Sequence, residues 1–289
     1  MANTKVIKHR IKTAKNISQI TRAMEMVAAS KMRRAQLQAL SARPYSQSLK
    51  KILISLLTTA SEFNHALMKE NASPVTAILI IATDKGLCGG LNTNHFRYLK
   101  DFISAKELQN LKFLIIGSKG RNFILKSHFE VLADFPQIKD KVDFQDSLSV
   151  SHFLINSFLK GEIGKAYVSF PQFISTLSQK PKIVQILPIS LGDLNRELGV
   201  STFKKDYLIE PGPRQVADWL LPYFLELVIF HYLLEARAAE QSARMVAMKN
   251  ASENATDIVD DLTLSYNKVR QAQITAQIAE VATAALTIY

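Results

Sequence analysis

The stretch ARMVAMKNASENATDIVDDLTLSYNKVRQAQIT, from Ala243 to Thr275, contains neither glycine nor proline. It lies in a longer segment without these helix-breaking residues, because the last glycine of the chain is Gly212 and the last proline is Pro222. A continuous helix over residues 223–289 would be about 100 Å long at 1.5 Å per residue. This length is typical of a coiled coil and exceeds that of helices inside globular domains.

A seam of apolar and small side chains is expected along this C-terminal helix. Small residues and methionine allow a partner helix to approach closely, although they specify its packing less strictly than leucine and isoleucine do. The candidate seam residues are Leu227, Leu234, Ala238, Met245, Met248, Ala255, Val259, Leu262, Val269 and Ala276.

The N-terminal segment predicts the partner helix. From Asn3 to about Ala60, apolar residues recur at spacings near three and four, which is the pattern of an amphipathic helix. Pro44 is expected to bend or restart this helix, because proline lacks the backbone N–H of a helical residue. The two terminal helices are therefore expected to pair in an antiparallel coiled coil.

The two prolines also predict the register of this pair. If Pro44 and Pro222 lie at the same level, the numbers of opposite residues add up to roughly 266. Lys31 would then lie beside Glu235. The C-terminal helix would have no partner beyond about residue 263, so its end is expected to project as a single helix.

The middle of the chain reads as an open, Rossmann-like α/β domain over residues 74–210. The segments VTAILIIAT (75–83) and LKFLIIGSKG (111–120) are short apolar runs that end in a glycine turn, as buried parallel strands do. Residues 165–173 and 181–189 read as later strands, and residues 91–103 and 149–163 as helices between them. The predicted fold class is α/β, with an N-terminal coiled-coil helix over residues 1–60 and a C-terminal one over residues 214–289.

The positive charge of the chain is confined to its N-terminal segment. The whole chain has a net charge of +11, and residues 1–51 contain seven lysines and five arginines against one acid, Glu25. The remaining residues are therefore neutral overall. A charge imbalance in one segment indicates that this segment has its own partner.

A glycine-containing loop, DKGLCGGLN (84–92), is the one stretch that resembles a phosphate cradle. Gly86, Gly89 and Gly90 are expected to form a tight turn between a strand and a helix. No Lys-Ser or Lys-Thr pair follows the last of these glycines, so the Walker pattern is incomplete, and the dinucleotide pattern is absent. A nucleotide-binding α/β protein remains an alternative, although no cofactor is predicted.

Other candidate chemistry is weaker still. No plausible His-Asp partner lies near Cys88 in sequence, and the six histidines show no metal-ligand spacing. A nucleic-acid-binding coiled coil is the second alternative, because the N-terminal segment is basic. Against it, the first 44 residues contain no aromatic side chain on which a base could stack.

Three long motifs, in order along the chain, resemble the gamma subunits of F-type ATP synthases. They are ITRAMEMVAASKMRRAQ (20–36), the loop DKGLCGGLN, and EARAAEQSARMVAMKNASENATDIVDDLTLSYNKVRQAQIT (235–275). The resemblance covers both ends of the chain and the start of the middle. It implies a non-catalytic rotor shaft, whose coiled coil stands inside a ring of three alpha and three beta subunits. The α/β domain of such a shaft contacts the epsilon subunit and the c-subunit ring.

The resemblance also implies roles for individual residues. Lys31, Arg33 and Arg34 are expected to face an acidic loop of beta, and Met24 to lie where both helices and beta approach each other. The further positions expected to contact beta or to take part in coupling are Arg244, Arg270, Gln271, Thr275 and Glu280. No nucleic acid is expected as a partner, and contact with the membrane is expected only through the complex.

Some positions depart from the family pattern. Gln277 replaces a usual glutamate, Ala239 replaces a serine, and Thr283 and Ala284 stand where glycines are usual. The resemblance begins within a few residues of Met1, which favours a bacterial protein at the cytoplasmic face of the inner membrane over one with a cleaved presequence.

Overall fold

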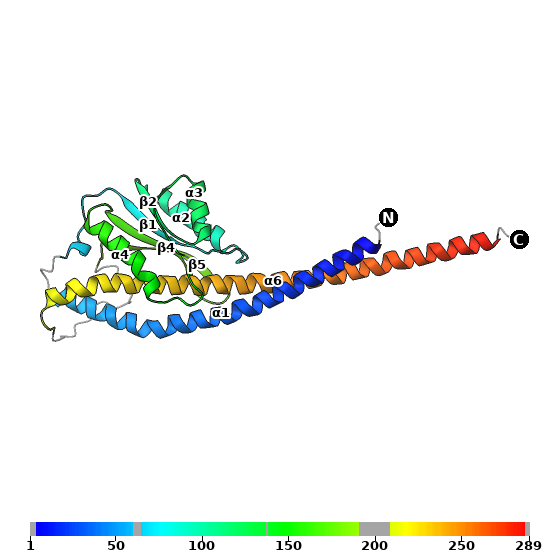
Figure 1. Ribbon diagram of the computed structural model, residues 1–289, viewed down its shortest axis with the longest axis horizontal. Coiled ribbons are helices and arrows are strands. Elements are labelled where there is room, and N and C mark those ends of the chain that lie inside the picture. The colour runs from blue at the N-terminus through cyan, green and yellow to red at the C-terminus, as the bar shows by residue number, and fades with distance from the viewer. Residues whose placement is uncertain (1–3, 60–64, 137, 191–208, 287–289) are drawn as a thin grey trace. The chain divides into compact units, whose positions relative to one another are not determined.

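The computed structural model of the chain describes residues 4–59, 65–136, 138–190 and 209–286. The chain forms two compact units, one from residues 1–28 and 244–289, the coil unit, and one from residues 29–243, the sheet unit. Figure 1 shows the two long terminal helices and the mixed α/β region, which confirm the predicted fold class. The boundary between the compact units falls inside both helices, whereas the sequence placed its divisions at the helix ends.

The two long helices are continuous through their prolines. Helix α1 (Thr4–Thr59) contains Pro44 and helix α6 (Pro213–Leu286) contains Pro222. The restart considered at Pro44 is therefore not seen. A proline inside a helix costs about 3 kcal/mol, and on α6 the burial of the nearby Leu221, Phe224 and Leu225 in the core of the sheet unit offsets this cost.

The sheet unit contains a five-stranded sheet in the order β3-β2-β1-β4-β5. The first four strands are parallel to their neighbours, and β5 is antiparallel to β4. This order is that of a Rossmann-like fold, as predicted. The strand bounds are β1 (Thr76–Ile81), β2 (Leu111–Ile116), β3 (Glu130–Phe135), β4 (Lys165–Phe173) and β5 (Gln179–Leu187).

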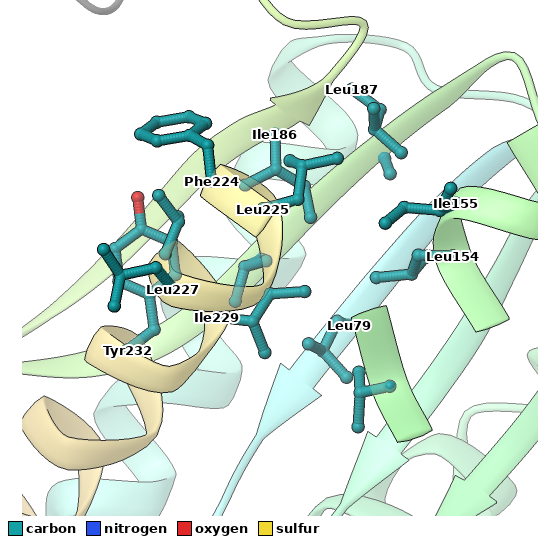
Figure 2. Close-up of a cluster of buried hydrophobic side chains, with 14 of the residues drawn as sticks. Leu79, Leu154, Ile155, Ile186, Leu187, Phe224, Leu225, Leu227, Ile229 and Tyr232 are labelled. Atoms are coloured by element: carbon teal, nitrogen blue, oxygen red, sulfur yellow. The ribbon is translucent and has the colours of Figure 1, made fainter. Parts of the chain in front are cut away.

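Alternate side chains of each strand enter different cores, because successive side chains of a strand point to opposite faces. Ile78 and Phe113 lie on the face covered by helices α2 (Leu91–Ala105) and α3 (Ser118–Lys126). Leu79 lies on the opposite face, which packs against helix α4 (Gln145–Leu159) and the first turns of α6 (Figure 2). A short 3₁₀ helix, η1 (Ala66–Met68), precedes the first strand.

The most apolar part of α6 is a core element of the sheet unit. The helix contains a window that is long and apolar enough to cross a membrane, and 56% of that window is buried within the structure. Leu225, Ile229 and Leu233 belong to the same cluster as Leu79 on the sheet. This window therefore packs against other parts of the protein.

The coil unit has the seam of a two-stranded coiled coil. One set of its buried and half-buried positions recurs at alternating spacings of three and four along each helix. On α6 they are Met245, Met248, Ser252, Ala255, Val259, Leu262, Tyr266 and Val269, and on α1 they are Thr4, Ile7, Ile11, Ala14, Ser18, Thr21, Glu25 and Ala28. Of the predicted seam residues, those from Met245 to Val269 lie in this seam, whereas Leu227 and Leu234 belong to the core of the sheet unit and Ala276 is exposed.

The predicted register is wrong by one to two helical turns. The hydroxyl of Ser18 lies 3.5 Å from that of Ser252 and 3.2 Å from that of Thr256, so opposite residue numbers add up to 270 to 274 instead of 266. The hydroxyls of Tyr45 and Tyr223, next to the two prolines, lie 2.9 Å apart, so the prolines do lie near one level and the error arises further along, in the coil unit. The unpaired end of α6 is confirmed but begins later, since residues 270–283 are all exposed.

Candidate functional site

The coil unit has a second apolar stripe outside its seam. Ile17, Ile20, Met24 and Val27 follow one another at spacings of three, four and three residues on α1. Ile17 is 48% exposed, Ile20 59% and Val27 55%, and Met24 is half-buried. Spacings of three and four place these side chains on one side of the helix. Met24, a predicted contact residue, thus belongs to an apolar surface that the described chain leaves largely uncovered.

A basic face occupies another part of the same helix. Lys5, Lys8, Lys12 and Lys15 are all exposed and line one shallow, open groove. Their spacing of three and four residues aligns four positive charges along about three helical turns. Four of the twelve basic residues of the N-terminal segment therefore form a stripe, which would attract an acidic partner surface.

The unpaired end of α6 exposes every predicted contact residue that lies on it. These residues are Arg270, Gln271, Thr275 and Glu280. The Thr275 hydroxyl donates a hydrogen bond to the carbonyl of Gln271 at 3.0 Å, so its own helix satisfies it. The same end also exposes apolar side chains, among them Ile278 at 64% and Val281 at 70%. A single helix of this composition is weakly stable in water and gains from a surrounding partner.

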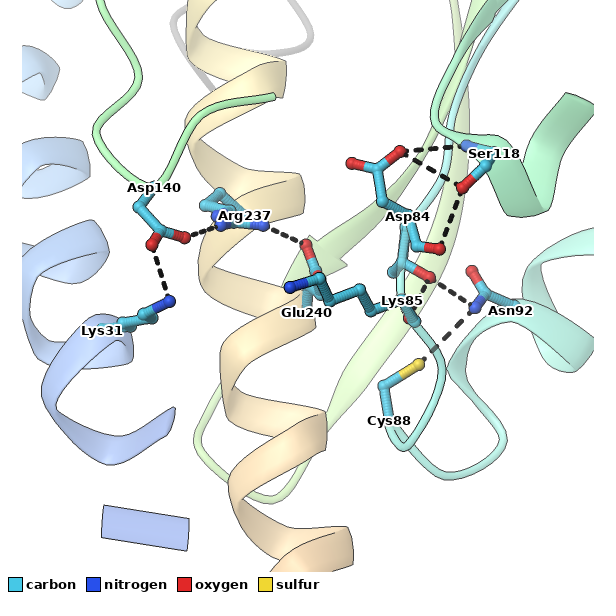
Figure 3. A network of polar contacts seen from close by, with 10 residues as sticks. Lys31, Asp84, Lys85, Cys88, Asn92, Ser118, Asp140, Arg237 and Glu240 are labelled. Carbon is cyan, nitrogen blue, oxygen red and sulfur yellow. Dashed lines mark hydrogen bonds and ion pairs between the residues drawn. The ribbon is translucent and has the colours of Figure 1, made fainter. Parts of the chain in front are cut away.

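An ion-pair network in the sheet unit engages another predicted contact residue. The Lys31 ammonium lies 2.6 Å from one carboxylate oxygen of Asp140, and Arg237 forms an ion pair with the other (Figure 3). The Arg237 guanidinium also lies 2.7 Å from the carboxylate of Glu240. The hydrogen bond from Lys31 and the charge of Arg237 lower the pKa of Asp140.

The remaining basic contact candidates differ in their surroundings. Arg33 and Arg34 are exposed on α1 in the sheet unit, and Arg244 is half-buried in the coil unit. Their exposure leaves Arg33 and Arg34 accessible to an acidic partner. The predicted contact residues therefore belong to both compact units.

The glycine loop is built as a structural turn. Among its three glycines, Gly89 has a positive φ of 59°, Gly90 is the N-cap of α2, and Gly86 has open space where a Cβ would lie. Leu87 also has a positive φ, of 62°. The tight turn thus depends on the backbone at residues 87 and 89 more than on all three glycines.

The carboxyl edge of the sheet offers little to a phosphate. A nucleotide in a Rossmann-like fold places its phosphates at a helix N-terminus on this edge. At the N-terminus of α3, however, the Asp84 carboxylate already accepts a hydrogen bond from the Ser118 backbone N–H at 3.0 Å. Its negative charge would repel an anion there. The geometry therefore disfavours phosphate binding at the N-terminus of α3.

A buried histidine and serine form a pair that the sequence did not reveal. His95 Nε2 on α2 lies 2.7 Å from the hydroxyl of Ser169 on β4, and both residues are completely or almost completely buried. Burial lowers the pKa of His95 to about 4. Its Nδ1 has no hydrogen-bond partner among the described residues, so no carboxylate orients the ring there. Closed off from solvent, this pair is a core contact rather than a catalytic dyad.

The other reactive side chains also lack the arrangement of a catalytic or metal site. Cys88 is buried, and its sulfur lies 3.5 Å from the side-chain nitrogen of Asn92. Over the described ranges, no group of three or more histidine, cysteine or acidic side chains is arranged to hold a metal ion. The features that stand out are therefore the surfaces of the two long helices.

Comparison with known proteins identifies the family of the chain. A family model described as ATP synthase matches residues 3–288. The ATP synthase gamma chain of Dehalococcoides mccartyi strain CBDB1 is 39% identical over 283 residues, 97% of each chain. The chain belongs to the ATP synthase gamma chain family. The gamma chain of Opitutus terrae is also similar, with 40% identity over 294 residues and 98% of each chain covered.

A solved structure shares the fold. A chain of the Euglena gracilis mitochondrial ATP synthase, in a structure described as OSCP, F1 and c-ring in rotational state 3, superposes with a TM-score of 0.66 at 19% identity. The match covers 99% of this chain and 94% of that one. Family membership confirms the expected function, that of the gamma subunit in the central stalk of an ATP synthase. The gamma chain is thus part of a membrane-associated complex.

Proposed function

We propose that this gamma chain couples rotation of a c-subunit ring to conformational change at the nucleotide sites of the beta subunits. The observation that carries the proposal is the uncovered apolar stripe of Ile17, Ile20, Met24 and Val27. A self-sufficient two-stranded coiled coil concentrates its apolar residues in one seam. A second stripe of isoleucine and valine requires a cover from another protein, and a ring of subunits around the shaft supplies one.

The shaft acts because its faces differ. The apolar stripe and the lysine stripe of α1 comprise different side chains and attract different partner surfaces. A subunit that meets the apolar stripe is biased toward one conformation, and a subunit that meets the charged stripe toward another, because only differential contact shifts a conformational equilibrium. Rotation then presents each face to each subunit in turn.

The proposed partners are three alpha and three beta subunits around the coil unit, with the epsilon subunit and the c ring as further contacts. The similarity to a chain in a structure that contains F1 and c-ring supports this assignment. By similarity to the Dehalococcoides mccartyi and Opitutus terrae gamma chains, we place the complex at the cytoplasmic face of a bacterial inner membrane. The gamma chain contacts the membrane only through the complex.

The proposed contacts with beta comprise both apolar and charged groups. Arg33 and Arg34 are exposed and face the acidic loop of beta. Lys31 joins them at the edge of this surface, while its ammonium is also held by Asp140. Met24 belongs to the apolar stripe. Arg244 and the exposed residues of the unpaired α6 end, which are Arg270, Gln271, Thr275 and Glu280, contact beta at other levels.

Co-purification tests the assignment directly. A tagged gamma chain expressed in its native host is expected to retain alpha and beta subunits after purification at physiological salt. The purified chain alone is expected neither to hydrolyse ATP nor to shift DNA or RNA in a gel. ATP hydrolysis by the isolated chain would favour the nucleotide-binding alternative, and a salt-sensitive shift of nucleic acid would favour the other.

A pair of neighbouring substitutions tests the apolar stripe. Ile20→Lys places a charge in the stripe, whereas Gln19→Lys adds the same charge to the lysine-bearing side of the helix, next to it in sequence. In purified complexes, Ile20→Lys is expected to reduce the number of protons pumped per ATP hydrolysed, because a buried unpaired charge destabilises the contact. Gln19→Lys is expected to leave this ratio unchanged. Equal ratios in the two variants would contradict the role of the stripe.

A further inference from the structure

We infer that Asp140 is a positioning residue that locks the two long helices to the α/β domain and so transmits torque between them. Asp140 lies in the loop between β3 and α4, and its two carboxylate oxygens pair with Lys31 on α1 and Arg237 on α6 (Figure 3). One carboxylate therefore joins three separate segments of the sheet unit. The inference rests on the proposed rotary function.

The charges of the two helices make this carboxylate necessary. The hydroxyls of Tyr45 on α1 and Tyr223 on α6 lie 2.9 Å apart, so residue numbers at one level of the sheet unit add up to 268. Lys31 and Arg237 add up to the same number and therefore lie at one level. Two cations at one level repel each other. The side chain of Arg237 is buried, whereas that of Lys31 is 37% exposed, so water screens this repulsion only on the side of Lys31. Asp140 converts the repulsion into two attractive contacts.

The burial of Arg237 increases its dependence on acidic partners. Its side chain is 10% exposed, and its Nε has no hydrogen-bond partner within the described part of the chain. A buried cation that loses a partner keeps the cost of desolvation without the compensating attraction. Glu240, on the same helix, forms an ion pair with the other side of the guanidinium.

Apolar packing at this level offers little resistance to sliding. The buried residues of the two helices here include Ala35, Ala236, Ala238 and Ala239. Methyl side chains interlock only shallowly, in contrast to the deep knobs and holes that leucine and isoleucine form. The ion pairs of Asp140 therefore supply the resistance that the alanines do not.

A second contact, a hydrogen bond, joins α6 to the sheet unit about one helical turn beyond Arg237. The Ser242 hydroxyl donates a hydrogen bond to the carbonyl of Thr176 at 2.7 Å, in the turn between β4 and β5. This hydrogen bond joins the β4–β5 turn to α6 alone, whereas Asp140 forms an ion pair with each of the two long helices. The sheet unit ends close to this hydrogen bond: its last residue on α6 is Ala243, and its first residue on α1 is Ala29. The ion pairs of Asp140 thus lie close to the ends of the helix segments that belong to the sheet unit.

Four variants of the purified ATP synthase separate this role from simple loss of folding. Asp140→Ala removes the carboxylate, Asp140→Asn keeps its shape without the charge, and Asp140→Glu keeps the charge. Asp143→Ala is the matched control, because Asp143 lies in the same loop and its ion pair is with the exposed Lys141. Each variant is assembled with its partner subunits and compared at equal ATP hydrolysis.

Two measurements decide the outcome. In Asp140→Ala and Asp140→Asn, backbone amides of residues 29–36 and 236–243 are expected to exchange hydrogen about tenfold faster, in line with coupling energies of directly interacting residues. The number of protons pumped per ATP is expected to fall in the same two variants, while Asp140→Glu and Asp143→Ala match the unaltered complex. If the Asp140 variants match Asp143→Ala in both measurements, the inference is wrong and the proposed function stands. If alpha and beta do not bind the unaltered chain, the proposed function itself is wrong.

Discussion

The sheet unit and the coil unit bury their apolar side chains to different degrees. Ile78 and Leu79 in the central strand are completely buried, with one helical layer on each side of the sheet. The seam residues Val259 and Leu262 are only half-buried, because a single partner helix covers one side of them. The sheet unit therefore has a core of its own, whereas the coil unit leaves part of its apolar surface uncovered.

The largest loss of stability is expected at Gly117, where the sheet unit has no room for a side chain. Gly117 has a φ of +100°, and a Cβ on it would lie 2.2 Å from the carbonyl oxygen of Ala82. Gly117→Ala is expected to destabilise the sheet unit by about 4 kcal/mol or more, since strain and overlap add. Thermal unfolding followed by near-UV circular dichroism measures this. The control is Gly86→Ala, for which nothing lies within 4 Å of the added methyl group; equal melting temperatures would refute the argument.

A smaller loss of stability is expected when the pH is lowered. His95 has a pKa of about 4 in the folded chain, below its ordinary value of 6.5, because burial disfavours its charged form. Between these two pH values the unfolded chain binds a proton that the folded chain does not, so the free energy of unfolding falls as the pH falls. The loss is about 3 kcal/mol at 1.36 kcal/mol per pKa unit.

The variant His95→Gln isolates this effect. Glutamine can still bond to the Ser169 hydroxyl but does not titrate in this range. Urea unfolding of the purified chain at pH 7 and pH 4.5 is expected to show a smaller loss of stability in His95→Gln than in the unaltered chain. An identical loss in the two proteins would show that other groups cause the acid sensitivity.

The smallest effect is expected in the coil unit. Leu262→Ala in the half-buried seam is expected to cost about 1 kcal/mol in the isolated chain, against the 2–5 kcal/mol typical of a leucine in a closed core. Loss of helical circular dichroism in urea measures the change. In the assembled complex the same substitution is expected to matter more, because partner subunits bury the seam further. A cost of several kcal/mol in the isolated chain would mean that the coil unit is self-sufficient.

Sequence patterns predicted the long elements well. The absence of glycine and proline after Pro222 predicted helix α6, and the apolar run before Gly117 predicted β2. Strand β3 and helix α3 were missed, because β3 is a short edge strand with mixed polarity and α3 has only nine residues. Local patterns of apolar residues are weak where an element is short or exposed on one side.

Contacts between distant segments could not be predicted. Nothing in the sequence near Asp140 indicates that it pairs with both Lys31 and Arg237, and the register argument placed Lys31 beside Glu235 instead. The buried pair of His95 and Ser169 is hidden for the same reason, because α2 and β4 are far apart in sequence. The resemblance located the surfaces that face partners, but it could not show how the chain holds its own helices.

The spacing of the coil seam has a mechanical consequence. Its alternation of three and four residues averages 3.5, slightly less than the 3.6 residues of one helical turn, so the two helices wind around each other with a left hand. A torque that winds such a pair further presses Val259 and Leu262 more tightly into the facing helix, while the opposite torque loosens them. The torsional stiffness of the coil unit is therefore expected to be greater for twist in one direction than in the other.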